Sequence, residues 1–357
     1  MRRAFTALTV FALVAFAGDM TTGGAELTKF KGHGTFRWTS FGGTNAGADG
    51  ANPSTEFSDF ISMSWVPRIS EQVDMYVSFS HKTTSNQLVQ FDQIYLNLHL
   101  DENFSLRGGQ FKVPFGYAYT RSGGSMYFAD RAAIGTGSQY KLYGGKDIGA
   151  MLTVNYQPVT FDLMISNGTG SDAHADTTIN KQITARIAAE PADWLTVGAS
   201  YARIGRPEIE DSTGTTEEWS SMGMDFYAVA EYPLSPSGTL LFTGEYMMLG
   251  YNGADVEGQE HHDGSRMSLM LGYKAELNSD VLVSVLPAVR YDACDPIASW
   301  AESADEPEDN RSFLDYCVNL GLFNKRNTLQ IGARSYSREN DDWDGYTDMY
   351  ANWRINF

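Results

Sequence analysis

The sequence predicts an all-β fold, a transmembrane antiparallel up-and-down β-barrel of about 16 strands. Three observations lead to this prediction. Apolar and polar residues alternate in segments of roughly ten residues along most of the chain. The connections between these segments are alternately short and long. The alternation of apolar and polar residues in the last segment continues to the final residue, Phe357.

The N-terminal residues have the features of a secretory signal peptide. Arg2 and Arg3 precede an apolar stretch that ends at Phe16, and the residues up to Ala17 fit a cleavage site. We therefore expect residues 1–17 to be removed on export. Residues 18–357 would then form a single barrel domain.

The alternating segments give each predicted strand two different faces. Segment 94–100 places four aliphatic residues on one face and Tyr95, Asn97 and His99 on the other. Segments 183–189 and 266–274 have the same period. A soluble sandwich would also alternate, so the period alone leaves the fold open.

The lengths of the connections favour a membrane barrel. Seven short turns alternate with eight long polar connections, so the short turns share one rim and the long connections share the other. The short turns lie near residues 67–69, 101–103, 157–158, 190–193, 234–237, 278–279 and 324–325. The long connections lie near residues 41–56, 82–90, 113–145, 168–178, 206–218, 251–263, 295–310 and 339–344. Aromatic residues next to the short turns would meet the membrane interface: Trp65, Phe104, Tyr156, Trp194, Tyr232 and Trp353.

The C-terminal strand explains why an apolar face runs to the end of the chain. In a closed barrel this strand pairs with the first one, and one of its faces meets lipid. Trp353, Ile355 and Phe357 lie on that face. A terminal aromatic residue after alternating apolar residues also resembles the signal that the barrel-assembly machinery of the bacterial outer membrane recognises.

Composition and motifs exclude several functions. A formal net charge of −18 argues against binding nucleic acid, which requires a basic face. His261 and His262 beside Asp263 are the only candidates for catalysis, and no serine partner is evident. We predict no enzyme activity, no metal and no cofactor. Cys294 and Cys317 flank the 295–310 connection on the same parity, so we hypothesise either a disulfide or two free thiols.

About sixteen strands would enclose a water-filled lumen. The inward parity is polar on most predicted strands and includes four arginines that would line the pore wall: Arg37, Arg186, Arg334 and Arg354. The third long connection, 113–145, far exceeds the usual loop length and is rich in aromatic residues. We expect this connection to fold into the lumen and to narrow it.

The same region carries an excess of positive charge. Between Ser105 and Lys146 the only acidic residue is Asp130. The cations are Arg107, Lys112, Arg121, Arg131, Lys141 and Lys146. Cations at a narrow constriction attract anions. The alternative is that these cations pair with wall carboxylates such as Asp162 or Glu245, and the sequence leaves both open.

Several motifs resemble the phosphate-selective porin O/P family. They are LRGGQFKVPFGYAYTRS, YFADRA, KDIGAMLTVNY, VLPAVRYDACDP and the closing YANWRINF. The resemblance implies a sixteen-stranded diffusion channel of the bacterial outer membrane, usually a homotrimer, surrounded by lipid and lipopolysaccharide and taking up phosphate or other small anionic solutes. It places Arg107, Lys112, Arg121 and Arg131 on the anion path. An adhesin or structural barrel, or a sheath for a separate electron-transfer cytochrome, remain the alternatives.

Overall fold

The computed structural model describes residues 28–40, 55–82, 89–132, 145–168, 181–210, 216–252, 264–295, 311–323, 326–338 and 345–357. The predicted signal peptide, Lys141 and most residues of the other long connections lie outside these ranges. The described residues form sixteen strands: β1 (Thr28–Ser40), β2 (Thr55–Pro67), β3 (Val73–Lys82), β4 (Gln90–His99), β5 (Phe104–Lys112), β6 (Lys146–Tyr156), β7 (Val159–Ser166), β8 (Gln182–Ala192), β9 (Leu195–Glu210), β10 (Thr216–Ser235), β11 (Gly238–Asn252), β12 (Gly264–Glu276), β13 (Leu282–Asp295), β14 (Arg311–Leu322), β15 (Asn327–Arg338) and β16 (Tyr346–Asn356).

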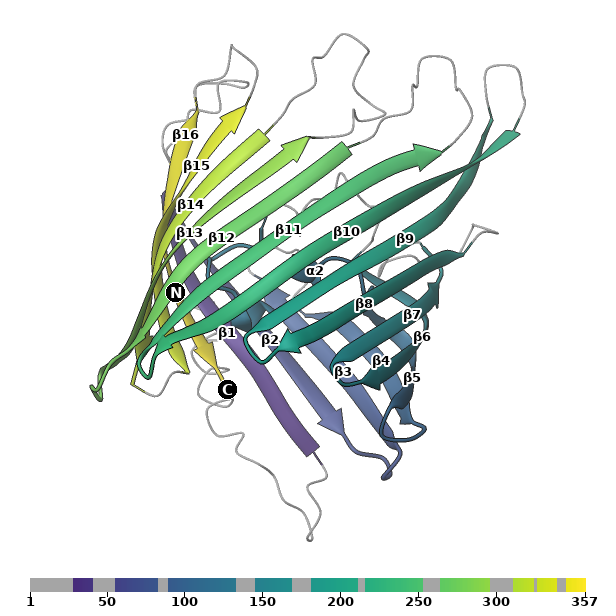
Figure 1. Cartoon of the computed structure of the whole chain (residues 1–357), viewed down its shortest axis with the longest axis horizontal. Helices are drawn as coiled ribbons and strands as arrows, with labels where there is room; N and C mark the ends of the chain where they lie inside the picture. Colours follow the sequence, from purple (N-terminus) through teal and green to yellow (C-terminus); the bar gives the residue numbers. More distant parts are fainter. Residues whose placement is uncertain are drawn as a thin grey trace.

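These strands close into one antiparallel barrel (Figure 1). Each strand pairs with its neighbours in the sequence, and β16 returns to pair with β1. The pairing of these two strands runs from His33 opposite Asn356 to Ser40 opposite Met349. Phe357 extends it, because its N–H donates to the Gly32 carbonyl at 3.0 Å and its carbonyl accepts the Gly32 N–H at 2.9 Å. The predicted barrel is confirmed, whereas the role of Phe357 in assembly stays a prediction.

The two faces of the strands differ as the alternation predicts. On β16 the side chains of Met349 and Trp353 are 58% and 49% exposed, whereas Tyr350 and Asn352 between them are 4% and 3% exposed. The large exposed side chains on the outside are mostly apolar, and many buried ones inside are polar or charged. Such an inverted arrangement suits lipid outside and a polar lumen inside.

Aromatic pairs lie at the short-turn ends of the strands. Phe104 contacts Tyr156 with ring centroids 6.2 Å apart, and Trp194 contacts Tyr232 at 5.3 Å. Both pairs join residues that flank short turns, where an amphipathic ring can meet the membrane interface.

The strands differ in length around the barrel. β10 has 20 residues, whereas β7 has eight. Figure 1 shows β9 and β10 running well beyond the shorter β3–β8 side of the barrel. These two strands continue through residues predicted to belong to the 206–218 connection, with Ile209 paired to Glu217. The prediction placed the strand ends too early because this polar, acidic stretch was assigned to a long connection, whereas the hairpin ladder continues into it.

Helical structure is sparse in the described residues. The chain between β5 and β6 contains α2 (Tyr117–Thr120) and the 3₁₀ turn η1 (Gly123–Ser125). Neither is long and apolar enough to cross a membrane.

Of the two states that the sequence left open for the cysteines, the structure has the one without a disulfide. Cys294 on β13 lies opposite Arg311 on β14, and Cys317 lies opposite Ala288. Neither cysteine forms a disulfide. A bond would need the two cysteines to face each other across the hairpin, and the register displaces them by six residues on each strand.

Candidate functional site

The barrel encloses a cavity of about 1270 Å³. Its lining comes from β1–β8, β15, β16 and the chain between β5 and β6; no described residue of β9–β14 contributes. The lining contains seven lysines and arginines and six acidic residues, nearly equal numbers. The pairing of these charges therefore decides the electrostatic character of the cavity.

The segment 113–132, which follows β5, lies inside the ring of strands and contacts opposite sides of it. At one end the Gly116 N–H donates to Ser200 Oγ on β9 at 3.1 Å. The N–H groups of Tyr117 and Ala118 donate to the Glu245 carboxylate on β11 at 2.7 and 2.9 Å. At the other end the carboxylate of Asp130 contacts β1. A carboxylate suits the first end because the N–H groups at the start of α2 have no partner within the helix.

Apolar packing holds the same segment against one side of the lumen. Val113 and Phe115 are buried with inward residues of β6, β7, β9 and β11, among them Met164 and Met247. Phe128 is 2% exposed and packs with a second cluster of inward residues: Leu241, Met270, Leu286, Ala288, Cys317 and Tyr350. The lumen is therefore apolar on one side, although the inward parity is polar on most predicted strands. The segment covers the apolar side, and the cavity lies along the polar side.

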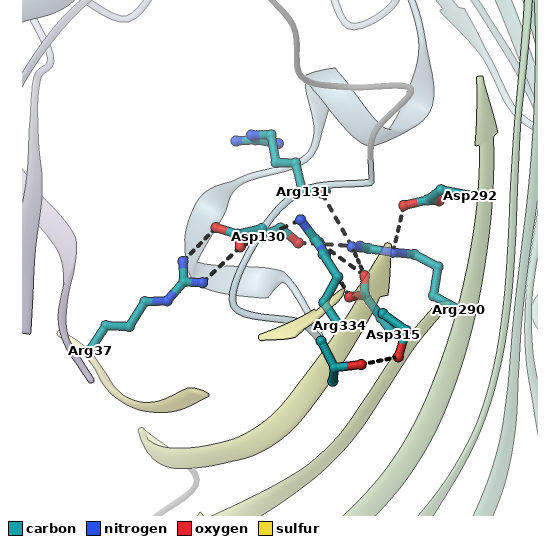
Figure 2. A network of polar contacts seen from close by, with 9 residues as sticks. Arg37, Asp130, Arg131, Arg290, Asp292, Asp315 and Arg334 are labelled. Atoms are coloured by element: carbon teal, nitrogen blue, oxygen red, sulfur yellow. Dashed lines mark hydrogen bonds and ion pairs between the residues drawn. The ribbon is translucent and has the colours of Figure 1, made fainter. Parts of the chain in front are cut away.

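A network of ion pairs fastens the far end of the segment to the wall (Figure 2). Arg37 on β1 donates two hydrogen bonds, of 2.6 and 2.9 Å, to the carboxylate of Asp130. Arg334 on β15 lies 3.7 Å from the same carboxylate. It also donates two hydrogen bonds, of 2.6 and 2.9 Å, to Asp315 on β14. Arg290 on β13 pairs with Asp315 and Asp292.

The charges around Asp130 keep it ionised. Burial opposes ionisation of this carboxyl, but the hydrogen bonds and charge of Arg37, with the charges of Arg334 and Arg290, lower its pKa below the ordinary value. Asp130 is therefore a carboxylate at neutral pH. Arg37, which lines the cavity, has its charge matched by this partner.

A second group of cations has neutral partners. Lys112 Nζ donates to the carbonyls of residues 119, 120 and 121 at 3.1, 3.2 and 3.0 Å. Arg131 Nη1 donates to those of residues 118, 121 and 119 at 2.7, 2.8 and 3.3 Å. Arg354 Nη1 donates to the Met126 carbonyl at 2.5 Å. These bonds satisfy carbonyls at the end of α2 and beyond it without cancelling the positive charge.

Two further arginines rest on aromatic rings. Arg107 donates to Asn97 Oδ1 at 2.8 Å and lies over the Tyr95 ring at 4.4 Å. Arg121 donates to Ser125 Oγ at 3.2 Å and lies over the Tyr127 ring at 4.5 Å. Within the described part of the chain, none of the five cations Arg107, Lys112, Arg121, Arg131 and Arg354 is paired with a carboxylate. Burial lowers the pKa of Arg131, and the nearby charge of Arg121 acts in the same direction, whereas Tyr119 and Asp92 oppose the shift.

The remaining predicted site residues are distributed differently. Lys146 pairs with Asp92, and Arg186 pairs with Asp162 at 3.1 Å. Arg186 lines the cavity, whereas Lys146, Arg121 and Arg334 do not. Both alternatives left open by the sequence therefore occur, since some cations pair with carboxylates and others do not.

Sequence reasoning missed the residues that hold the segment. Glu245 was considered only as a partner for cations, and it binds backbone N–H groups instead. Ser200 and Phe128 gave no separate signal. The apolar residues on inward positions, such as Met247 and Met270, were the available sign that something packs inside the barrel.

A closed sixteen-strand barrel, apolar outside and partly polar inside, defines the class of outer-membrane porins. Residues 72–261, more than half of the chain, match the model of the family described as phosphate-selective porin O and P, and the chain belongs to this family. The protein is a porin of the bacterial outer membrane.

Solved structures share the fold at low sequence identity. OprB of Pseudomonas putida superposes with a TM-score of 0.67 at 9% identity, covering 93% of this chain and 94% of that one. The anion-selective porin from Comamonas acidovorans superposes with a TM-score of 0.59 at 11% identity, covering 92% of this chain and 99% of that one. A trimer form of OmpT, an outer membrane protein of Vibrio cholerae, superposes with a TM-score of 0.56 at 10% identity, covering 92% of this chain and 99% of that one. The comparison with curated proteins found no match.

Proposed function

We propose that this porin is a passive diffusion channel for small hydrophilic solutes with a preference for anions, phosphate among them. One observation carries the proposal. Four of the cations with neutral partners, Arg107, Lys112, Arg131 and Arg354, line the cavity, whereas Arg37 and Arg186 there are matched by carboxylates.

Charges that line the cavity act on a passing ion more strongly than the exposed charges outside it. Two unit charges about 4 Å apart interact by about 4 kcal/mol at an effective dielectric of 20, against about 1 kcal/mol in bulk water. The net charge of −18 opposes the entry of anions, but exposed charges are screened within about 8 Å at physiological ionic strength. The cations of the narrow cavity are screened less, so they decide the preference.

Family membership supports phosphate as one of the anions, since the family is described as phosphate-selective. The anion-selective porin from Comamonas acidovorans has the same fold. The segment 113–132 contacts β11 at one end and β1 at the other, which leaves less room for a second protein and argues against a sheath. We also propose a homotrimer, as in the trimer form of OmpT, embedded in lipid and lipopolysaccharide after insertion by the barrel-assembly machinery.

Phosphate block tests the proposal. The chloride current of single channels in a planar bilayer should fall as phosphate is added at constant ionic strength, because phosphate competes for the same cations. Sulfate at equal charge serves as the control for valence. A chloride current that phosphate leaves unchanged would contradict the phosphate preference, and a barrel that forms no channel would contradict the function.

A further inference from the structure

We propose that Asp130 limits the ion preference of this channel by masking Arg37 at the cavity wall. The proposal rests on the proposed function to the extent that ions pass through this cavity. It adds a residue that sets selectivity by cancelling a cation rather than by touching the solute.

The first step is the geometry of the pair. Arg37 and Asp130 both line the cavity, and two hydrogen bonds of 2.6 and 2.9 Å join the guanidinium to the carboxylate. Among the described residues Arg37 is paired with no other carboxylate. A planar pair of this kind presents almost no net charge to a passing ion.

The second step is the charge of the surrounding network. Arg37, Arg290 and Arg334 face Asp130, Asp292 and Asp315, so three positive charges meet three negative ones (Figure 2). Of these six, only Arg37 and Asp130 line the cavity. Loss of the Asp130 charge would therefore leave an uncompensated cation directly on the wall.

The third step is that the segment stays in place without this charge. Arg290 donates to the backbone carbonyls of residues 130 and 131, each at 3.2 Å. Gln330 and Arg354 donate to the carbonyl of Met126 at 3.3 and 2.5 Å. Phe128 is buried between these contacts. An asparagine at position 130 keeps the shape and one acceptor for Arg37, so the network loses a charge and not an anchor.

The experiment compares four channels by reversal potential in a salt gradient. Asp130→Asn should raise the anion-to-cation permeability ratio by about 16-fold, because one unit charge a few ångström away in a water-filled passage favours an anion and disfavours a cation by about fourfold each. Arg37→Gln should lower the ratio by a similar factor, because Asp130 is then unmasked. The double variant Asp130→Asn/Arg37→Gln should return to the wild-type ratio.

Two controls make the outcome decisive. Asp292→Asn changes the net charge equally but lies off the cavity, so its ratio should stay close to wild type. Single-channel conductance reports the position of the segment and should change little in Asp130→Asn. An unchanged ratio in Asp130→Asn, an equal shift in Asp292→Asn, a double variant that does not cancel, or a large rise in conductance would each overturn the proposal. A wild-type channel that prefers cations would contradict the proposed anion preference. It would not contradict the role of Asp130, provided that Asp130→Asn still raises the anion-to-cation permeability ratio.

Discussion

Two adjacent glycines on β5 occupy opposite environments. Gly109 has φ of +131°, and a Cβ there would lie 2.4 Å from the Ile94 carbonyl oxygen and 2.8 Å from the Cα of Tyr95. At Gly108 nothing lies within 4 Å of the corresponding position. Only the first position therefore requires glycine for both conformation and space.

We predict that Gly109→Ala lowers the free energy of unfolding by about 1–3 kcal/mol, because it combines backbone strain with a backbone clash. Gly108→Ala is the matched control and should stay within about 0.5 kcal/mol of wild type. Urea unfolding of the refolded barrel in lipid vesicles measures both. Equal losses for the two variants would contradict the assignment of strain to Gly109.

The lowered pKa of Asp130 predicts how its effect depends on pH. A carboxyl with a lowered pKa in the folded state stabilises the fold above its unfolded pKa, and this contribution is lost as the pH falls through the folded value. The difference in permeability ratio between wild type and Asp130→Asn should therefore stay constant from about pH 8 to pH 5 and vanish only below the ordinary aspartate pKa of about 3.9. Reversal potentials at stepped pH measure it. A difference that disappears above pH 5 would show that Asp130 is not held ionised by the arginines.

At the scale of elements, we propose that the segment after β5 determines how much of the lumen stays open. It is held by the Glu245 carboxylate at one end, by Arg37 at the other, and by Phe115 and Phe128 between them. These contacts come from strands on opposite sides of the barrel. The segment is thus a fixed part of the interior.

We predict that replacing residues 116–144 by a short glycine linker raises single-channel conductance severalfold, because the ring of strands would then enclose an unobstructed lumen. The matched control shortens a different long connection, residues 253–263, and should leave conductance unchanged. Planar-bilayer recordings measure both. Unchanged conductance after the first deletion would mean that the segment does not set the width of the passage.

Over the whole molecule, the sequence predicts the pattern of alternation better than it predicts contacts between distant residues. The outward face of β16 follows from a local period of two, and strand number and barrel closure follow from the alternation of short and long connections. Both patterns can be read without knowing which residues lie next to one another in space. The Arg37–Asp130 pair joins residues 93 positions apart, and no local signal selects Asp130 over another acid. The pairing of the cysteines stayed open for a related reason, because the register of β13 and β14 could not be derived from a long connection between them.

The charge balance of the site also depends on contacts between distant residues, which the sequence does not predict. An excess of cations between Ser105 and Lys146 was visible in the sequence, but their partners were not. Lys112 and Arg131 bind backbone carbonyls and no carboxylate among the described residues, whereas Lys146 pairs with Asp92. Composition gives the number of charges in a segment, and only the fold determines which of them remain uncompensated.

The central claim is that uncompensated cations beside the cavity make this porin prefer anions. The most direct measurement is the reversal potential of the purified wild-type channel in a KCl gradient at about 0.15 M ionic strength, beside the variant Arg121→Glu/Arg131→Glu. We expect the wild-type channel to prefer anions, and we expect this preference to be abolished or reversed in the variant. A wild-type channel that prefers cations under these conditions would contradict it, because wall carboxylates would then control the passage.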